Sequence, residues 1–116
     1  QRRGRTADPV RRDRLARLYS QIACMRWSTA RELAKIGQGN QPSATMGGLA
    51  KLAWAGASQD LASLAVEVLG PAALVEPGPL GSWSHALAAS PSSSIAGGTS
   101  DINRNIVAEH GLGLAR

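Results

Sequence analysis

The 116-residue sequence is poor in side chains that carry out chemistry without a cofactor. It has one cysteine, two histidines and no phenylalanine. Cys24 has no partner for an internal disulfide, which suits a reducing compartment, and its apolar neighbours predict a small buried side chain rather than a nucleophile. His85 and His110 are far apart, and neither has a second ligand three or four positions away. The sequence therefore predicts no metal site.

Long apolar runs are also missing. No stretch is long enough to cross a bilayer, and no charged leader precedes an apolar segment, so we expect no membrane contact and a cytoplasmic location. The sequence contains neither a GxxxxGK[ST] loop nor a strand followed by GxGxxG, which argues against a P-loop or Rossmann nucleotide site. At this length we expect one domain with one core.

Positive charge is concentrated at the start of the chain. The formal net charge is +5, and the first 17 residues alone hold seven arginines against two aspartates. Only Tyr19 adds an aromatic ring there, whereas nucleic-acid surfaces usually spread cations and aromatics over a docking face. We expect a solvated helix start. Contact with an anionic ligand or partner subunit is the alternative, and nucleic-acid binding is the least favoured of the three.

Helical periodicity dominates the first two thirds of the sequence. Asp8-Pro9 offers a cap and a first-turn proline, which predicts a helix to about Lys35 that ends within 37–40. A second helix is predicted from 41–43 to 69–71, and small residues in its first half permit close helix approach. Each helix would be roughly 40 Å long, so we expect both to pack also against something outside the chain. The predicted core residues are Leu15, Leu18, Ile22, Met25, Thr29, Leu33 and Ile36 in the first helix, and Met46, Leu49, Ala50, Ala53, Ala57, Leu61, Leu64 and Val68 in the second.

The last third of the sequence is more broken. Proline and glycine between residues 70 and 81 predict an irregular connector, and a short helix is predicted over 82–90 before Pro91 interrupts it. A final helix is predicted from Thr99 to Gly111, with Ile102 and Ile106 on its apolar side. Together these elements predict an all-α, up-down helical bundle.

The final helix begins at an unusual stretch, Gly97-Gly98-Thr99-Ser100-Asp101. Two glycines free the backbone to turn, and the hydroxyl groups of Thr99 and Ser100 are able to cap the first helical amides. Because an exposed helix start also attracts anions, the turn is either a structural cap or a cradle for a cofactor. An acidic side chain at Asp101 is favourable to the helix dipole but weakens such a site for phosphate.

Residues 95–109, followed by 111–116, resemble the C-terminal signature of acyl-CoA dehydrogenases, which typically reads close to GGTSEIQRNIIAERVLGLPR. The resemblance implies that residues 1–116 are the C-terminal helical domain of such an enzyme. By this resemblance, the chain supplies three helices of a four-helix bundle and a short helix. The family's N-terminal helical domain, its middle β-domain and the first helix of this bundle would lie outside the chain. Further matches, in the family's order, are Asp8-Pro9-Val10, Arg14-Leu15-Ala16, Ala50-Lys51-Leu52 and Leu69-Gly70-Pro71-Ala72.

The resemblance implies a flavoprotein of fatty acid or lipid metabolism, an oxidoreductase that uses FAD to convert an acyl-CoA thioester to the 2,3-enoyl-CoA. By resemblance, Thr99, Ser100 and Asp101 touch FAD, and Gly98 lies close to the thioester. Glu67 and Gly70 belong to a segment that contributes to the FAD site of a neighbouring subunit. Identical or paralogous subunits in a dimer or tetramer are the implied partners.

The sequence departs from the family at three places. Some members carry the catalytic glutamate at the position of Gly97, so this chain has no base there and no catalytic residue is assigned. Glu67 replaces a common glutamine and would repel a pyrophosphate unless it is neutralised. Asp101 and Asn103 are each one methylene shorter than the usual residues, about 1.3 Å, which favours water-mediated contacts over direct hydrogen bonds.

The sequence is compatible with two functions. The first is the C-terminal domain of a flavin-dependent acyl-CoA dehydrogenase, which contributes to FAD binding and subunit assembly and is inactive when isolated. The second is a noncatalytic partner subunit, or helical interaction module, of a heteromeric dehydrogenase.

Overall fold

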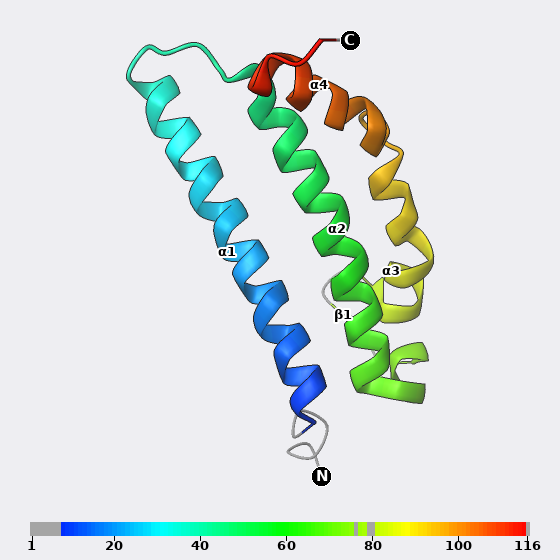
Figure 1. Ribbon diagram of the computed structural model, residues 1–116. Coiled ribbons are helices and arrows are strands. Elements are labelled where there is room, and N and C mark those ends of the chain that lie inside the picture. Colours follow the sequence, from blue (N-terminus) through cyan, green and yellow to red (C-terminus); the bar gives the residue numbers. More distant parts are fainter. Residues whose placement is uncertain (1–7, 76, 79–80, 116) are drawn as a thin grey trace.

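The protein is all-α, as the sequence predicts (Figure 1). The computed structural model describes residues 8–75, 77–78 and 81–115. Two long antiparallel helices are followed by shorter elements that return along the second of them. In chain order the elements are α1 (Pro9–Gly37), α2 (Ala44–Leu69), the 3₁₀ turn η2 (Gly70–Leu74), β1 (Pro77–Gly78), β2 (Gly81–Ser82), α3 (Trp83–Ala89), the 3₁₀ turn η3 (Ser90–Ser94) and α4 (Ser100–Leu112).

Local signals set the ends of the long helices. The Asp8 carboxylate accepts a hydrogen bond from the Val10 N–H at 2.9 Å and caps α1. That helix ends two residues later than predicted, and Gly39, with a φ of +88°, follows in the left-handed region. Helix α2 ends at Gly70, which adopts a φ of +58°. These glycines terminate the helices because they adopt a positive φ without steric cost.

The predicted irregular connector is partly ordered. Its first residues form η2, and β1 pairs antiparallel with β2 through Pro77 opposite Ser82 and Gly78 opposite Gly81. The helix predicted over 82–90 is confirmed as α3, with the Ser82 hydroxyl accepting the His85 N–H at 3.2 Å. The proline-led tight turn at η2 accounts for part of the added order, since proline fixes φ near the value that a 3₁₀ turn needs.

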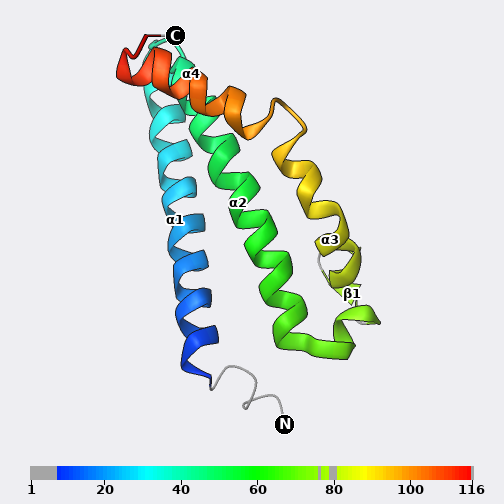
Figure 2. The same cartoon turned by 45° about the vertical axis from the view of Figure 1, so that its right-hand side comes forward.

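Helix α2 is the centre of the molecule. Helix α1 packs along one side of it, while α3, η3 and α4 pack along the other (Figures 1 and 2). A small core lies between α1 and α2, where Leu18, Ala57 and Leu64 are buried and Met25 and Leu61 are packed against them. Helix α4 crosses the N-terminal end of α2.

Small residues make the α2–α4 crossing close, as the sequence predicts. A Cβ atom built at Gly48 would lie 3.2 Å from the Asn103 carbonyl oxygen and 3.3 Å from Val107 Cγ2. The predicted apolar side of α4 is wrong in one respect, because Ile102 is 53% exposed. Asn103 and Val107 face α2 instead, since the crossing at Gly48 decides which side of α4 is covered.

Much of the predicted core is uncovered in this chain. On α1 only Leu18 is buried, whereas the other large aliphatic side chains of the stripe are exposed: Leu15, Ile22, Leu33 and Ile36. On α2, Leu49 and Ala53 are also exposed. Cys24, predicted to be buried, is exposed. The physical reason is that α1 packs chiefly on one neighbour, α2, which covers only a narrow strip of its surface.

The dimensions agree with a partly covered bundle. The radius of gyration is 17.1 Å, against about 13 Å for a compact chain of this length. The solvent-accessible surface is 8279 Å², against roughly 6000 Å² for a compact monomer of this mass. The long helices therefore leave more surface open than one compact domain does, as their lengths predict.

An apolar groove of about 360 Å³ runs between α1, α2 and α3, and continues along η3. Trp54 lines it and is 58% exposed, so this tryptophan is not a core anchor within the chain. Ser58 lines the same groove, and its buried hydroxyl has no hydrogen-bond partner in the part of the chain that the structure describes.

Candidate functional site

The glycine-led turn before α4 has the form that its sequence predicts. Gly97 and Gly98 adopt φ values of +74° and +95°. The Thr99 hydroxyl accepts a hydrogen bond from the Ile102 N–H at 3.4 Å and caps the helix, which begins at Ser100. Of the two hydroxyls predicted to cap, only that of Thr99 does so. The turn and the cap present the first amides of α4 at its exposed start.

Asn103 supports this turn from the inside. The residue is 6% exposed, and its Nδ2 donates to the carbonyl oxygens of Gly98 and Thr99, each at 3.0 Å. We predicted that the short Asn103 side chain would contact a ligand through water, and this is wrong because the amide points into the chain. Its inward role was missed, because the predicted apolar side of α4 was that of Ile102 and Ile106 rather than that of Val107.

Helix α2 fixes the segment that leads into the turn. The Lys51 ammonium donates to the Ser93 carbonyl oxygen, and Gln59 Nε2 donates to the Ser94 hydroxyl at 3.4 Å. Gly97 also lies beside Lys51, since a Cβ atom built there would be 3.5 Å from Lys51 Cε. The turn is therefore held against α2 by contacts before, within and after it.

Asp101 pairs with Arg104 one turn further along α4. Arg104 Nη1 donates to Asp101 Oδ1 at 2.7 Å, and the Asp101 side chain is 87% exposed. The pair joins positions i and i+3, which are neighbours on the helix surface. An exposed pair of this kind adds little stability, but it partly neutralises the carboxylate at the start of the helix.

A second candidate group lies at the other end of α2. Glu67 accepts hydrogen bonds from Arg11 Nε at 3.2 Å, on Oε1, and from Arg14 Nη1, on Oε2. Each of the three side chains is between 32% and 39% exposed. Two arginines of α1 thus offset the negative charge of the Glu67 carboxylate. These arginines belong to the basic start of the chain, which is consequently not all free solvated charge.

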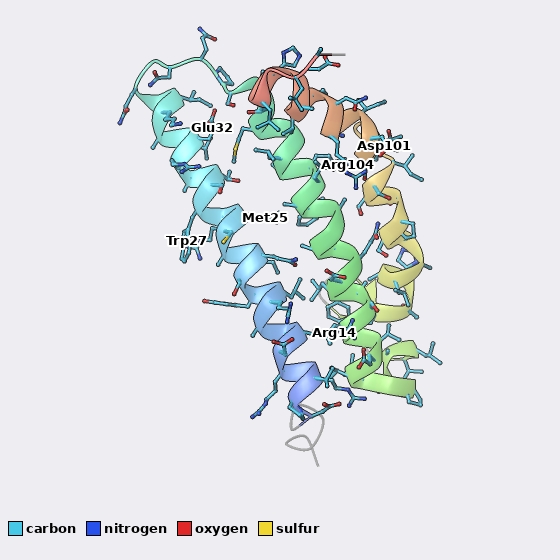
Figure 3. All side chains as sticks on the ribbon, viewed as in Figure 1. Arg14, Met25, Trp27, Glu32, Asp101 and Arg104 are labelled. Atoms are coloured by element: carbon cyan, nitrogen blue, oxygen red, sulfur yellow. The ribbon has the colours of Figure 1, made fainter. Side chains whose placement is uncertain are left out.

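The structure does not bring the two groups of candidate residues together. Gly48 of α2 touches α4 just beyond the turn, whereas Glu67 and Gly70 lie at the opposite end of α2. Glu67 follows Gly48 by 19 positions along the helix, a span of roughly 28 Å. Figure 3 shows the same separation, with Arg14 near the start of α1 and with Asp101 and Arg104 at the far end of the molecule.

Two other kinds of site receive no support from the described residues. Within 8–75, 77–78 and 81–115, no three His, Cys, Asp or Glu side chains are grouped so that they could hold a metal ion. No helix in this part of the chain is long and apolar enough to span a membrane.

These features define a helical-bundle domain whose last helix opens at a polar, glycine-led turn. The sequence profile of the family described as "Acyl-CoA dehydrogenase, C-terminal domain" matches residues 1–112. The chain therefore belongs to this family, which confirms the resemblance drawn from its last residues.

Two curated relatives carry the same printed name, Acyl-CoA dehydrogenase IpdE1. The protein from Mycolicibacterium smegmatis is 34% identical over 116 residues, which cover 99% of this chain and 28% of the relative. The protein from Mycobacterium tuberculosis is 34% identical over 110 residues, which cover 94% of this chain and 28% of the relative. The chain thus spans little more than a quarter of the length of these relatives. No solved structure gives a significant match.

Proposed function

We propose that residues 1–116 form the C-terminal helical domain of an FAD-dependent acyl-CoA dehydrogenase, and that the domain contributes to FAD binding and to subunit assembly. The observation that carries the proposal is the turn at Gly97–Asp101, in which a threonine cap and an exposed helix start are held against α2. Family membership supports the reaction class, α,β-dehydrogenation of an acyl-CoA thioester.

The donors at this turn fit an acceptor-rich group such as FAD. Because Thr99 Oγ1 accepts the Ile102 N–H, its own proton remains available for a ligand. Ser100 adds a second hydroxyl, and the start of α4 favours negative charge. The Arg104 pairing reduces the repulsion that Asp101 would otherwise exert on a phosphate. When bound, FAD would accept the hydride, while these residues would bind and orient it.

We further propose that Glu67 and Gly70 serve the FAD of a neighbouring subunit. Their separation from Thr99 by most of the length of α2 supports this division, since each end of the helix then serves a different site. Arg11 and Arg14 make the arrangement electrostatically acceptable, because they offset the Glu67 carboxylate. The excess of exposed apolar surface on α1 and α2 supports assembly with identical or paralogous subunits.

Proton abstraction is assigned to a group outside this turn. Gly97 carries no side chain, so the base that some relatives keep at this position is absent here. Gly98 is proposed to lie near the acyl-CoA thioester, where a residue without a side chain lets the substrate approach. We expect residues 1–116 alone to bind FAD without catalysing acyl-CoA dehydrogenation. The unpaired Cys24 supports a reducing compartment such as the cytoplasm.

The second candidate function is a noncatalytic partner subunit of a heteromeric dehydrogenase. It is favoured by one observation, the glycine at position 97 where some relatives have their catalytic glutamate. Such a subunit would keep the packing surfaces and a flavin contact, while its partner would supply the base.

The two functions are tested on the protein purified in its natural assembly. The chromophore is released and FAD is measured per chain, and the assembly is then assayed for acyl-CoA dehydrogenation with an artificial electron acceptor. The proposal expects bound FAD and a lower FAD content in Thr99→Val, with Ser63→Ala on the exposed side of α2 as the control. A flavin-free assembly that does not rebind FAD would contradict both functions. Turnover by a natural assembly in which every subunit contains this domain would exclude the partner-subunit function.

A further inference from the structure

We infer that Asn103 is a positioning residue, which turns the backbone N–H groups of Thr99 and Ser100 outward, toward the proposed flavin site. The inference rests on the proposed function for its ligand. The orientation itself follows from hydrogen bonds within the chain.

The acceptors at the turn determine which end of the Asn103 amide faces them. The two groups that face the Asn103 amide, the carbonyl oxygens of Gly98 and Thr99, only accept hydrogen bonds. The NH₂ end of the amide must therefore point toward them, and both of its protons are used. Because the side chain is buried, losing these bonds would leave polar groups without water to replace them.

The planar peptide unit then determines the direction of the next N–H group. In a planar trans peptide, the C=O of one residue and the N–H of the next point in opposite directions. None of the peptide bonds in the described chain is cis. Drawing the Gly98 carbonyl inward to Asn103 therefore turns the Thr99 N–H outward, and drawing the Thr99 carbonyl inward does the same for the Ser100 N–H.

Within the part of the chain that the structure describes, neither the Thr99 N–H nor the Ser100 N–H donates a hydrogen bond to another protein group. The Thr99 carbonyl also accepts the Asn103 backbone N–H at 3.1 Å, so both ends of Asn103 hold the same peptide unit. Asn103, through its buried amide and its backbone N–H, thus presents two adjacent donors in a fixed direction, which lowers the entropic cost of binding an acceptor-rich ligand.

Gly98 makes this arrangement possible. Its φ of +95° brings its carbonyl over the Asn103 amide, and a Cβ atom built there would lie 3.2 Å from Asn103 Nδ2. A side chain at position 98 would therefore press on the group that orients the turn.

The experiment compares Asn103→Asp and Asn103→Ala with the wild-type protein. Asn103→Asp keeps the shape but lacks the donors, and Asn103→Ala removes the amide without adding charge. We measure the FAD dissociation constant by flavin fluorescence, the amide ¹H and ¹⁵N chemical shifts of Thr99 and Ser100 without FAD, and the melting temperature. Both variants are expected to raise the dissociation constant about tenfold or more and to move the two amide resonances.

Val107→Ala is the matched control, because it loosens the α2–α4 contact without touching the turn. It is expected to lower the melting temperature while the dissociation constant stays within about threefold of wild type, a small free-energy change. Asn103→Gln, which keeps the donors on a longer side chain, is expected to bind FAD better than either test variant.

The outcomes separate the inference from the proposed function. Equal losses of FAD affinity in Val107→Ala and Asn103→Ala, at similar melting temperatures, would mean that Asn103 only stabilises the helix and would overturn the inference. Unchanged Thr99 and Ser100 resonances in both Asn103 variants would also overturn it. A wild-type protein that binds no FAD would instead contradict the proposed function, while the amide resonances would still decide the orienting role of Asn103.

Discussion

Gly48 of α2 and Val107 of α4 lie so close together that a Cβ atom at residue 48 would be 3.3 Å from Val107 Cγ2. The backbone carbonyl of the residue that supports the turn, Asn103, would be 3.2 Å from the same atom. This contact fixes the distance between α2 and the helix that begins at the candidate site. Gly48 therefore sets how closely the backbone of Asn103 approaches α2.

The glycine pair at 47 and 48 offers a direct test of this contact. Gly48→Ala is expected to destabilise the protein by about 1–3 kcal/mol, because the added methyl group overpacks the crossing. Gly47→Ala meets nothing within 4 Å and is expected to stabilise α2 by about 0.5–1 kcal/mol through helix propensity. Urea unfolding monitored by circular dichroism measures both. Equal effects of the two substitutions would contradict the close crossing.

A second pair isolates the contact between Gly98 and Asn103. Gly98→Ala and Gly39→Ala each place a side chain at a similar positive φ, +95° and +88°, with a backbone cost of about 1–2 kcal/mol. Only the methyl group at position 98 also presses on a neighbour, since position 39 has nothing within 4 Å. We expect Gly98→Ala to be the more destabilising in thermal unfolding. A larger loss of thermal stability in Gly39→Ala than in Gly98→Ala would contradict the close contact between Gly98 and Asn103.

Removal of the buried Ser58 hydroxyl is not expected to lower the stability of the protein. A buried polar atom without a partner costs about 1–3 kcal/mol, so Ser58→Ala is expected to be neutral or to stabilise the protein within that range. Ser63→Ala, on the exposed side of the same helix, should change stability by less than about 0.5 kcal/mol. A clear loss of stability in Ser58→Ala, measured by denaturant unfolding, would show that the hydroxyl has a partner in the assembly.

Because Arg11 and Arg14 both pair with Glu67, we expect a second substitution at Glu67 to compensate for the loss of one arginine. Arg14→Gln leaves the Glu67 carboxylate with only Arg11, so FAD retention by the assembly is expected to fall because a negative charge is exposed beside the proposed phosphate position. Adding Glu67→Gln removes that charge, and retention should recover at least in part. Gel filtration followed by flavin absorbance measures the retained FAD. A double variant that retains less FAD than Arg14→Gln alone would argue against a phosphate at this end of α2.

The ends of the helices could be predicted because short-range chemistry sets them. Asp8 and Thr99 cap the helices that follow them, and Gly70 ends α2, so each boundary was correct to within two residues. The family was also evident from residues 95–116, since the profile comparison confirms it.

Burial was harder to predict because it depends on distant partners. Leu33 and Ile36 follow the same helical period as Leu18, yet only Leu18 lies where α2 covers α1. The inward role of Asn103 was missed for a related reason, since it arises only when Gly48 brings α4 close to α2. Periodicity gives the face of a helix, whereas the crossing helix decides how much of that face is covered.

The distance between the two ends of α2 has a genetic consequence. When each chain contributes Thr99 to one flavin site and Glu67 to another, a lesion at either end damages one role and leaves the other intact. Two inactive variants, each damaged at a different end, would then assemble into a mixed dimer in which one of the two sites is built only from undamaged halves. With random pairing, half of the dimers are mixed and each has one intact site of two, so co-expression should restore about a quarter of the flavin content. A site contained within one chain would not allow this complementation between alleles.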